Sequence, residues 1–180
     1  GVTDFLCRGE LVHSPRSARF LRVTIDRSVI RVQAMLIAPN TTRTAHAVSL
    51  NAPTIENPAG YHRLIGGTVE LGESHRDTIR REVDEELGAT IRDLTLLTTV
   101  ENIFTLDGDP GHEIVFLYSG RLDPAPPAAG ATLTENDGTT VPVVWRSISG
   151  DTETLPLYPS AAEPWVINLA SVAGETGVGP

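Results

Sequence analysis

Acidic side chains are concentrated in one uninterrupted run, Gly67 to Ala89, with the sequence GTVELGESHRDTIRREVDEELGA. Glu82, Glu85 and Glu86 stand there at positions i, i+3 and i+4, so a helix over this run would point all three carboxylates to one face. Such crowding destabilises a helix unless a cation neutralises it, and oxygen ligands suit Mg²⁺ or Mn²⁺. Held there, a divalent cation suits hydrolysis of a phosphoanhydride. A solvated acidic helix face is the alternative interpretation.

The same run contains the signals of the helix that would carry these carboxylates. Ser74 is a natural N-cap, and Asp77 falls in the first turn, where the helix dipole favours an acidic side chain. Gly88 can take the left-handed conformation that ends a helix. Aliphatic residues recur at every fourth position and predict a buried stripe: Ile79, Val83 and Leu87.

Strand patterns lie on both sides of this helix. Segments rich in β-branched and other apolar residues predict strands at 20–25, 29–38, 46–50, 94–104, 112–121 and 141–145,. A polar turn after residue 105 should join two of these strands as a hairpin. The proline-rich segment 123–131 is expected to be a surface loop, and 160–172 a second helix. Strands around a central helix, followed by another helix, indicate mixed α/β layers.

Composition narrows the classes of function. The 180 residues suffice for one domain with a sizeable core, and the net charge of -9 argues against a surface that coats nucleic acid,. Cys7 is the only cysteine, so no intramolecular disulfide is expected, and a reducing cytoplasm is the expected location,. No apolar run approaches membrane-spanning length, and no signal peptide is visible.

The acidic run also resembles the Nudix hydrolase signature. The matching positions are Gly67, Glu73, Arg81, Glu82, Val83, Glu85, Glu86 and Gly88. The one departure is Ala89, where the family prefers a larger aliphatic residue. The resemblance implies an α/β fold, a Nudix-type α/β/α sandwich around a mixed β-sheet, over residues 20–172. Residues 1–19 would then be an N-terminal extension and 173–180 a C-terminal tail.

The resemblance also implies roles for residues in and beside the run. Glu82 and Glu86 match the family's main metal ligands, and Glu85 matches a further ligand. The backbone carbonyl of Gly66 matches a ligand that several members use. A glycine pair at this point would let the chain approach the ion closely. Glu82 and Glu85 are also the residues of the run that are candidates for the general base.

Other candidates brace the run or lie outside it. Glu73 and Arg81 match a pair that more often braces the loop against the helix than touches substrate. Arg63 could clamp a phosphate with its two-pronged guanidinium, with an exposed strand arginine as the alternative. Glu113 could be a base or a ribose contact, although a solvated strand end is the favoured interpretation. Glu135 is the candidate general base outside the run, since some family members place a catalytic glutamate on a loop in this region.

Seven further side chains carry expectations about their place in the molecule. Glu70, in the extended form of the signature, would brace the site or lie just outside the metal ligands. The histidines His46, His62 and His75 lack metal-ligand spacing and are expected at the surface. Trp145, Tyr158 and Trp165 are expected in the core or at its edge, with one of them a candidate for stacking on a base.

The resemblance therefore predicts a Mg²⁺- or Mn²⁺-dependent pyrophosphohydrolase. Its substrate would be a nucleoside di- or triphosphate or a nucleotide-linked small molecule, with no nucleic acid or membrane partner. A non-catalytic ligand-binding or regulatory domain of the same fold is the alternative. An isopentenyl diphosphate isomerase would need a catalytic cysteine, and Cys7 precedes the first predicted strand. The substrate, the number of metal ions and the oligomeric state, including a homodimer, are left open.

Overall fold

The structure is a computed structural model, and it describes residues 29–135, 138–149 and 155–171. The strand expected at 20–25 and the two segments expected to flank the domain lie outside these ranges. Within them, no helix has the length and the apolar character needed to cross a membrane.

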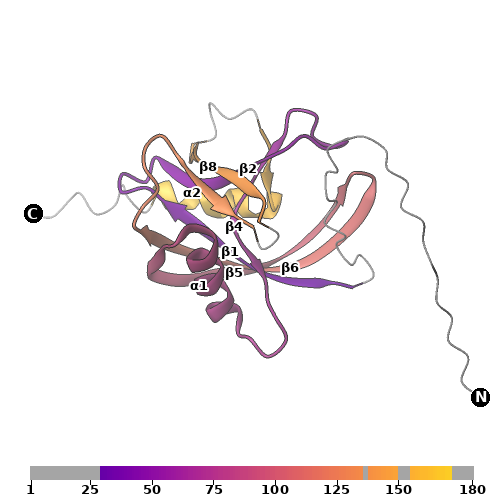
Figure 1. Ribbon diagram of the computed structural model, residues 1–180, viewed down its shortest axis with the longest axis horizontal. Coiled ribbons are helices and arrows are strands. Elements are labelled where there is room, and N and C mark those ends of the chain that lie inside the picture. The colour runs from indigo at the N-terminus through magenta and orange to yellow at the C-terminus, as the bar shows by residue number, and fades with distance from the viewer. Residues whose placement is uncertain (1–28, 136–137, 150–154, 172–180) are drawn as a thin grey trace, which may run out of the picture.

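In the described residues, one mixed β-sheet of nine strands forms the centre of the molecule (Figure 1). The strands are β1 Arg31–Pro39, β2 Ala45–Asn51, β3 Tyr61–Arg63, β4 Ile65–Thr68, β5 Thr90–Leu106, β6 Asp109–Asp123, β7 Ala131–Thr134, β8 Thr140–Ser147 and β9 Leu157–Tyr158. The main path is β5-β6-β1-β2-β3-β9, with β4 beside β1, β8 beside β2 and β7 beside β8. β1 is parallel to β6 and antiparallel to β2 and β4, which makes the sheet mixed, as predicted.

Helices cover both faces of this sheet. They are α1 His75–Leu87, the short 3₁₀ helix η1 Ser160–Ala162, and α2 Glu163–Ser171. β1 lies between the layers, and because successive side chains of a strand point to opposite faces, it feeds two cores. Leu36 belongs to the core that contains residues of α1, whereas Met35 and Ile37 belong to the core that contains residues of η1 and α2. The arrangement confirms the α/β class.

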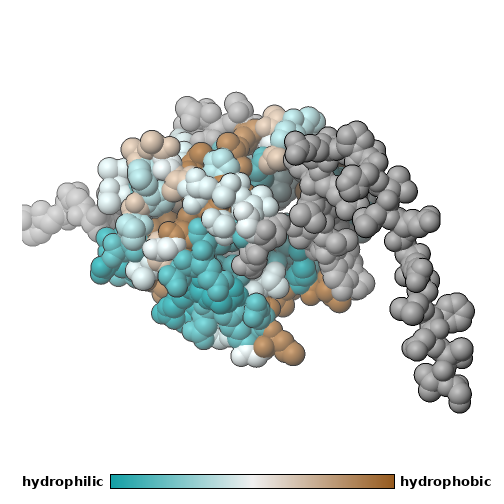
Figure 2. Space-filling view, in the orientation of Figure 1, coloured by the Kyte–Doolittle hydropathy of each residue, from teal (hydrophilic) through white to brown (hydrophobic). Residues whose placement is uncertain are grey.

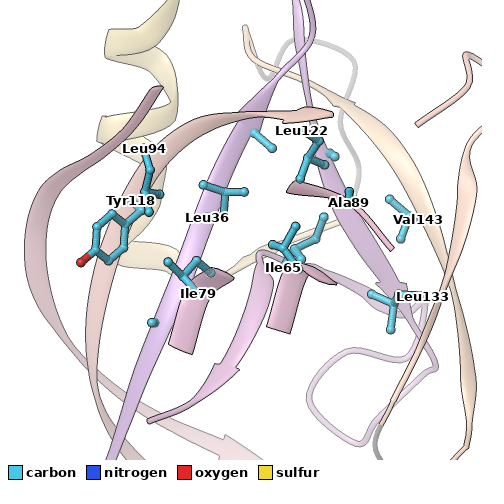
Figure 3. Packing of buried hydrophobic residues seen from close by; sticks show 13 residues of the cluster. Leu36, Ile65, Ile79, Ala89, Leu94, Tyr118, Leu122, Leu133 and Val143 are labelled. Carbon is cyan, nitrogen blue, oxygen red and sulfur yellow. The ribbon is translucent and has the colours of Figure 1, made fainter. Parts of the chain in front are cut away.

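Helix α1 forms as the sequence predicts. The Ser74 hydroxyl oxygen accepts the Asp77 backbone N–H at 3.2 Å, and Gly88 ends the helix with φ 60° and ψ 30°. Ile79 and Val83 are fully buried against the sheet (Figure 3 shows Ile79 among its neighbours). Each such side chain contributes on the order of 1.5–3 kcal/mol. The opposite side of α1 is hydrophilic surface (Figure 2). Burial of one stripe therefore fixes which way the carboxylates of the helix point.

The hairpin of β5 and β6 is longer than expected and extends away from α1 (Figure 1). Its turn consists of Asp107 and Gly108, both with positive φ, 53° and 82°, as suits a two-residue hairpin loop,. The carboxylate of Glu56 accepts the backbone N–H groups of both turn residues at 2.9 Å. This contact ties the tip of the hairpin to the loop between β2 and β3.

Two local expectations need correction. The segment expected to be a loop at 123–131 ends in β7, which the sequence did not predict, because β7 is only four residues long. The second predicted helix forms where expected, but its first turn is 3₁₀.

The expectation that His46 and His62 lie at the surface is wrong. His46 is fully buried and His62 is 6 % exposed, whereas His75 is partly exposed. His46 stands two residues before Val48 on β2, so both side chains face the same core,. His62 receives a hydrogen bond from Arg146 at 2.9 Å. The strand periodicity that places hydrophobic residues inside also carries His46 inside.

Candidate active site

A cavity of about 590 Å³ lies where α1, β4 and the β5–β6 hairpin meet. Its lining residues are Arg31, Gln33, Met35, Asn51, Asn57, Tyr61, Arg63, Gly66, Gly67, Thr68, Glu82, Glu86, Asn102, Phe104, Thr105, Leu106, Glu113, Glu135, Thr139, Tyr158 and Pro159. They come from seven strands, one helix and three connecting segments. Six of the candidate site residues predicted from the sequence are in this set: Arg63, Gly66, Glu82, Glu86, Glu113 and Glu135.

Glu82 and Glu86 supply the carboxylates that α1 presents to this cavity. They stand one helical turn apart and are 4 % and 8 % exposed. Burial raises the pKa of Glu82. Burial, together with the charge of Glu135, raises the pKa of Glu86 to about 8. Glu86 makes no hydrogen bond or ion pair within the described residues. A buried, unpaired carboxylate of this kind is stabilised by a nearby cation.

Gly67 makes room for one of these carboxylates. A Cβ at this position would lie 2.2 Å from Oε1 of Glu82. Gly66 has a different constraint, because its φ is 133° and a Cβ there would lie 2.1 Å from the backbone oxygen of Ala34. The glycine pair was expected to allow close approach to an ion. In the structure, the side chain of Glu82 lies close to Gly67, and the backbone of β1 lies close to Gly66.

Glu85 does not join the other two carboxylates. Its side chain is 48 % exposed and accepts a hydrogen bond from Arg81 Nη1 at 3.0 Å. Among the described residues, no three His, Cys, Asp or Glu side chains are grouped closely enough to hold a metal ion. The expectation of three converging carboxylates is therefore not met. Adjacent helical residues lie about 100° apart, so Glu85 points away once Glu86 faces the cavity.

Glu73 and Arg81 lie outside the cavity lining and connect the loop before α1 to the helix. Arg81 Nε and Nη2 each lie 3.0 Å from an oxygen of Glu73. Arg81 Nη1 also lies 3.0 Å from Oε1 of Glu82. The hydrogen bond from Arg81 holds the pKa of Glu73 at about 2. These contacts are those of a brace.

Glu113 lines the middle of the cavity and is 5 % exposed, so the expectation of a solvated strand end is wrong. Its two oxygens accept hydrogen bonds from Arg31 at 2.5 Å and from Asn102 at 3.0 Å. Arg63 lies nearer the carboxylates of α1 and donates to the backbone oxygen of Gly66 at 3.2 Å. Arg63 is half-buried, so the alternative that it is an exposed strand arginine is wrong as well.

Glu135 follows β7 and lies on the cavity wall, where its charge acts on Glu86. Its backbone N–H donates to the Thr139 carbonyl at 2.8 Å, which closes the segment back toward β8. Glu70, by contrast, is exposed and does not line the cavity. Glu135 thus lines the same cavity as Glu82 and Glu86, although it comes from a segment far from α1 in the sequence.

Aromatic residues that the sequence analysis largely missed also line the cavity. Tyr61 and Tyr158 meet edge to face with ring centroids 5.5 Å apart, and Phe104 lines the same cavity. The Tyr158 hydroxyl donates to the side chain of Asn57 at 3.3 Å. Tyr61 stands two residues before Arg63 on β3, so strand alternation could have placed the two together. Tyr158 was one of three candidates, and it alone lines the cavity.

Comparison with known proteins identifies the family of the chain. The family model for the NUDIX domain matches residues 54–149, more than half of the chain. The chain belongs to the Nudix family of hydrolases. The matched segment contains the whole Nudix box, which here comprises the end of β4, the loop before α1, and α1. β1 and β2 precede the matched segment, although both are part of the sheet.

Solved Nudix structures share the fold. MutT from Aliivibrio salmonicida or Vibrio cholerae is 18% identical, with a TM-score of 0.52 over 80% of this chain and 99% of that one. The MutT Nudix hydrolase of Burkholderia pseudomallei is 21% identical, with a TM-score of 0.50 over 78% and 98%. A Nudix hydrolase of Nitrosomonas europaea is 19% identical, with a TM-score of 0.51 over 83% and 90%. At these identities, the likeness supports the fold.

Proposed function

We propose that this protein is a Mg²⁺- or Mn²⁺-dependent pyrophosphohydrolase. Its substrate would be a nucleoside di- or triphosphate or a nucleotide-linked small molecule. The observation that carries the proposal is the buried, unpaired carboxylate of Glu86 beside Glu82 at one end of a cavity of about 590 Å³. A volume of that order suits a small-molecule ligand.

The donor set fits a hard divalent cation. Glu82, Glu86 and the backbone oxygen of Gly66 all line the same end of the cavity. Glu85 would add a further oxygen only by leaving Arg81. A bound cation would neutralise phosphate oxygens and lower the pKa of water. Oxygen ligands and remaining open positions are the arrangement that Mg²⁺ prefers.

The chain's own residues would divide the remaining work. Glu135 faces the carboxylates from a different segment and would accept the proton of the attacking water. Arg63 would hold a phosphate through its two-pronged guanidinium. Glu113, fixed by Arg31 and Asn102, would accept a hydrogen bond from a hydroxyl of the substrate. Glu113 is already oriented by its protein partners, which limits the entropy lost on binding,.

The aromatic residues of the cavity support a nucleotide as the substrate class. Tyr61, Tyr158 and Phe104 present aromatic surface to the same cavity as the charged lining residues. A planar base can pack against aromatic rings. The net charge of -9 does not oppose an anionic substrate, because a bound cation reverses the local sign,. A cytoplasmic location is part of the same proposal.

The test is a metal-dependent release assay on a panel of nucleotides and nucleotide sugars. Turnover with Mg²⁺ or Mn²⁺, and its loss in excess EDTA, is the expected result. Full turnover in EDTA would exclude the metal mechanism. The panel also identifies the substrate, since the cleaved compound is read from its products.

One observation favours the alternative, a non-catalytic ligand-binding domain. Within the described residues, no three potential metal-ligating side chains are grouped together. Such a domain would bind members of the panel without cleaving them in the presence of Mg²⁺ and Mn²⁺. Calorimetry on the same compounds therefore separates the two functions.

A further inference from the structure

Arg63 donates a hydrogen bond to the Gly66 backbone oxygen, which is one of the proposed ligands of the cation. Its Nη1 donates to the Gly66 backbone oxygen at 3.2 Å, and its Nη2 donates to Oε1 of Gln33 at 3.4 Å. Gln33 is in turn held by a hydrogen bond to Thr68 at 2.9 Å. The guanidinium thus lies at the end of the cavity that carries the carboxylates.

Both acceptors of Arg63 are neutral. Within the described residues, Arg63 forms no ion pair with a carboxylate, whereas Arg31, the other cationic side chain in the lining, is paired with Glu113 at 2.5 Å. Hydrogen bonds to neutral oxygens are weaker than those to anions. Arg63 is therefore a cation that a stronger ligand, such as a phosphate, can draw away from its present partners.

Gly66 does not need Arg63 to keep its conformation. Its position is set by antiparallel pairing with Met35 of β1 and by close approach to the backbone of Ala34. The carbonyl oxygen would stay in place if the guanidinium left. The contact between Arg63 and Gly66 is therefore not needed to hold β4 in place. Its effect is to put a positive charge beside the carboxylates of Glu82 and Glu86.

We propose that Arg63 is a positioning residue that alternates between the neutral oxygens it now contacts, beside Glu82 and Glu86, and the phosphate of the substrate. Without a divalent cation, it supplies positive charge at the Gly66 carbonyl beside Glu82 and Glu86. When a cation takes that oxygen, the guanidinium is repelled and turns to the phosphate of the substrate. This inference rests on the proposed function, and it makes the cation and the phosphate bind with positive coupling.

The physical reason is competition for one oxygen. A divalent cation binds oxygen ligands at about 2.0–2.1 Å, and a guanidinium on the same atom would be close enough to repel it. The planar fork of arginine matches two phosphate oxygens, so the displaced side chain gains a better partner. Arg63 stays tethered to β3, which keeps the fork within the cavity.

The experiment measures metal binding without turnover. Mn²⁺ is titrated by calorimetry into the wild-type protein and into Arg63→Gln. The matched control is Arg80→Gln, which removes the same charge from a half-exposed position on α1 outside the cavity. Arg63→Gln should bind Mn²⁺ about tenfold more tightly than wild type, a typical size for coupling between sites. Arg80→Gln should bind it as wild type does.

A second titration uses methylenediphosphonate, a diphosphate mimic that is not hydrolysed, on the Mn²⁺-saturated proteins. Arg63→Gln should bind it at least tenfold more weakly than wild type. Arg63→Lys keeps the charge without the fork, so it should keep the wild-type Mn²⁺ affinity and lose part of the diphosphonate affinity. If Arg63→Gln does not fold, Arg63→Lys still tests diphosphonate binding, and Arg63→Met, which also removes the charge, replaces it in the Mn²⁺ titration.

The direction of the Mn²⁺ effect decides the inference. Unchanged or weaker Mn²⁺ binding by Arg63→Gln would mean that Arg63 only braces the glycine pair, and would overturn the exchange. Unchanged diphosphonate binding by Arg63→Gln would overturn the claim that Arg63 turns to the phosphate of the substrate. If the wild-type protein binds no Mn²⁺ at all, the proposed function itself fails, which is a different result from either of these.

Discussion

Arg81 and Glu73 form a two-point ion pair, in which Nε and Nη2 of the arginine each lie 3.0 Å from one carboxylate oxygen. The third nitrogen of the same guanidinium lies 3.0 Å from Oε1 of Glu82. One arginine therefore connects the loop before α1 to a carboxylate of the cavity. Glu73 orients Glu82 through Arg81 without lining the cavity itself.

This pair predicts a stability effect that depends on pH. The hydrogen bond from Arg81 lowers the pKa of Glu73 from 4.5 to about 2, so the folded state binds its proton less readily than the unfolded state. The stabilisation is present above pH 4.5 and is lost as the pH falls toward 2,. Glu73→Gln should lower the free energy of unfolding by about 1 kcal/mol at pH 7. The deficit should vanish near the acid end of the window.

Urea unfolding at several pH values measures this effect. Glu70→Gln is the matched control, because Glu70 is an exposed glutamate of the same loop. It should unfold as the wild type does throughout. A deficit for Glu73→Gln that stays constant down to pH 2 would show that the carboxylate charge is not what stabilises the loop.

The positions of the α1 carboxylates predict unequal effects of substitution. Glu82→Gln and Glu86→Gln should each reduce kcat roughly a hundredfold or more, because each removes a metal ligand at nearly constant volume. Glu85→Gln should reduce kcat less than tenfold if Glu85 keeps its hydrogen bond with Arg81 during catalysis. Asp84→Asn, an exposed acidic position of the same helix, is the control. An equal loss in Glu85→Gln would show that Glu85 moves to the metal during catalysis.

Gly67 predicts a substitution that harms the site more than the fold. A Cβ at this position meets Glu82 at 2.2 Å, and the carboxylate can rotate away at little cost in stability. Gly67→Ala should therefore reduce Mn²⁺ affinity and kcat while changing the melting temperature little. Gly88→Ala is the opposite case, because φ there is 60° and nothing lies within 4 Å. It should lower stability by about 1 kcal/mol and leave kcat unchanged. If Gly67→Ala keeps wild-type kcat, Glu82 does not need its present position.

The local signals in the sequence predicted α1 well. Ser74 and Gly88 cap the helix where expected, since both act through contacts within a few residues. The family also follows from local spacing, because every ligand position of the box lies in one run. The strand signals placed β1, β2, β5, β6 and β8 but not their exact bounds. Hairpin length depends on what the tip contacts, here the carboxylate of Glu56.

The site itself could be predicted only in part. Nothing in the spacing of Glu82, Glu85 and Glu86 says which two face the cavity, because that depends on how Ile79 and Val83 pack against the sheet. Tyr158 reaches the cavity from the end of the chain through the pairing of β9 with β3. Such pairings join segments far apart in sequence, and one sequence carries no signal for them.

His46 predicts a second dependence of stability on pH. Burial, the charge of Arg146 and that of His62 lower its pKa from 6.5 to about 3, and neither ring nitrogen has a hydrogen-bond partner in the described structure. The unfolded state takes up a proton below pH 6.5 that the folded state refuses, so stability is lost as the pH falls from 6.5 toward 3,. His46→Leu should remove this part of the acid sensitivity.

Denaturant unfolding between pH 7 and pH 4 tests this prediction as a difference between the two proteins. The variant should equal or exceed the wild type at pH 7, because leucine leaves no buried nitrogen unpaired. Its advantage should grow by up to about 1.4 kcal/mol for each pH unit below 6.5. Parallel curves for the two proteins would show that His46 is protonated, or solvated, in the folded state.

Glu135 is the group that would activate water from outside the helix. It lines the cavity, and its charge is the largest contribution from another residue to the raised pKa of Glu86. Glu135→Gln should slow kcat by roughly a hundredfold or more, the usual size of general-base catalysis. Mn²⁺ affinity should change little, because Glu82 and Glu86 would still bind the ion. Glu101→Gln, at an exposed site outside the cavity, is the control.

The pair of measurements separates a base from a ligand. Loss of kcat with Mn²⁺ affinity retained assigns proton transfer to Glu135. Loss of both would make Glu135 a metal ligand supplied by the segment after β7. Wild-type kcat in the variant would return the base to the helix, where Glu82 and Glu85 are the remaining candidates. The pH profile gives a further check, since loss of the base should flatten the rise of kcat with pH that an ionised carboxylate produces.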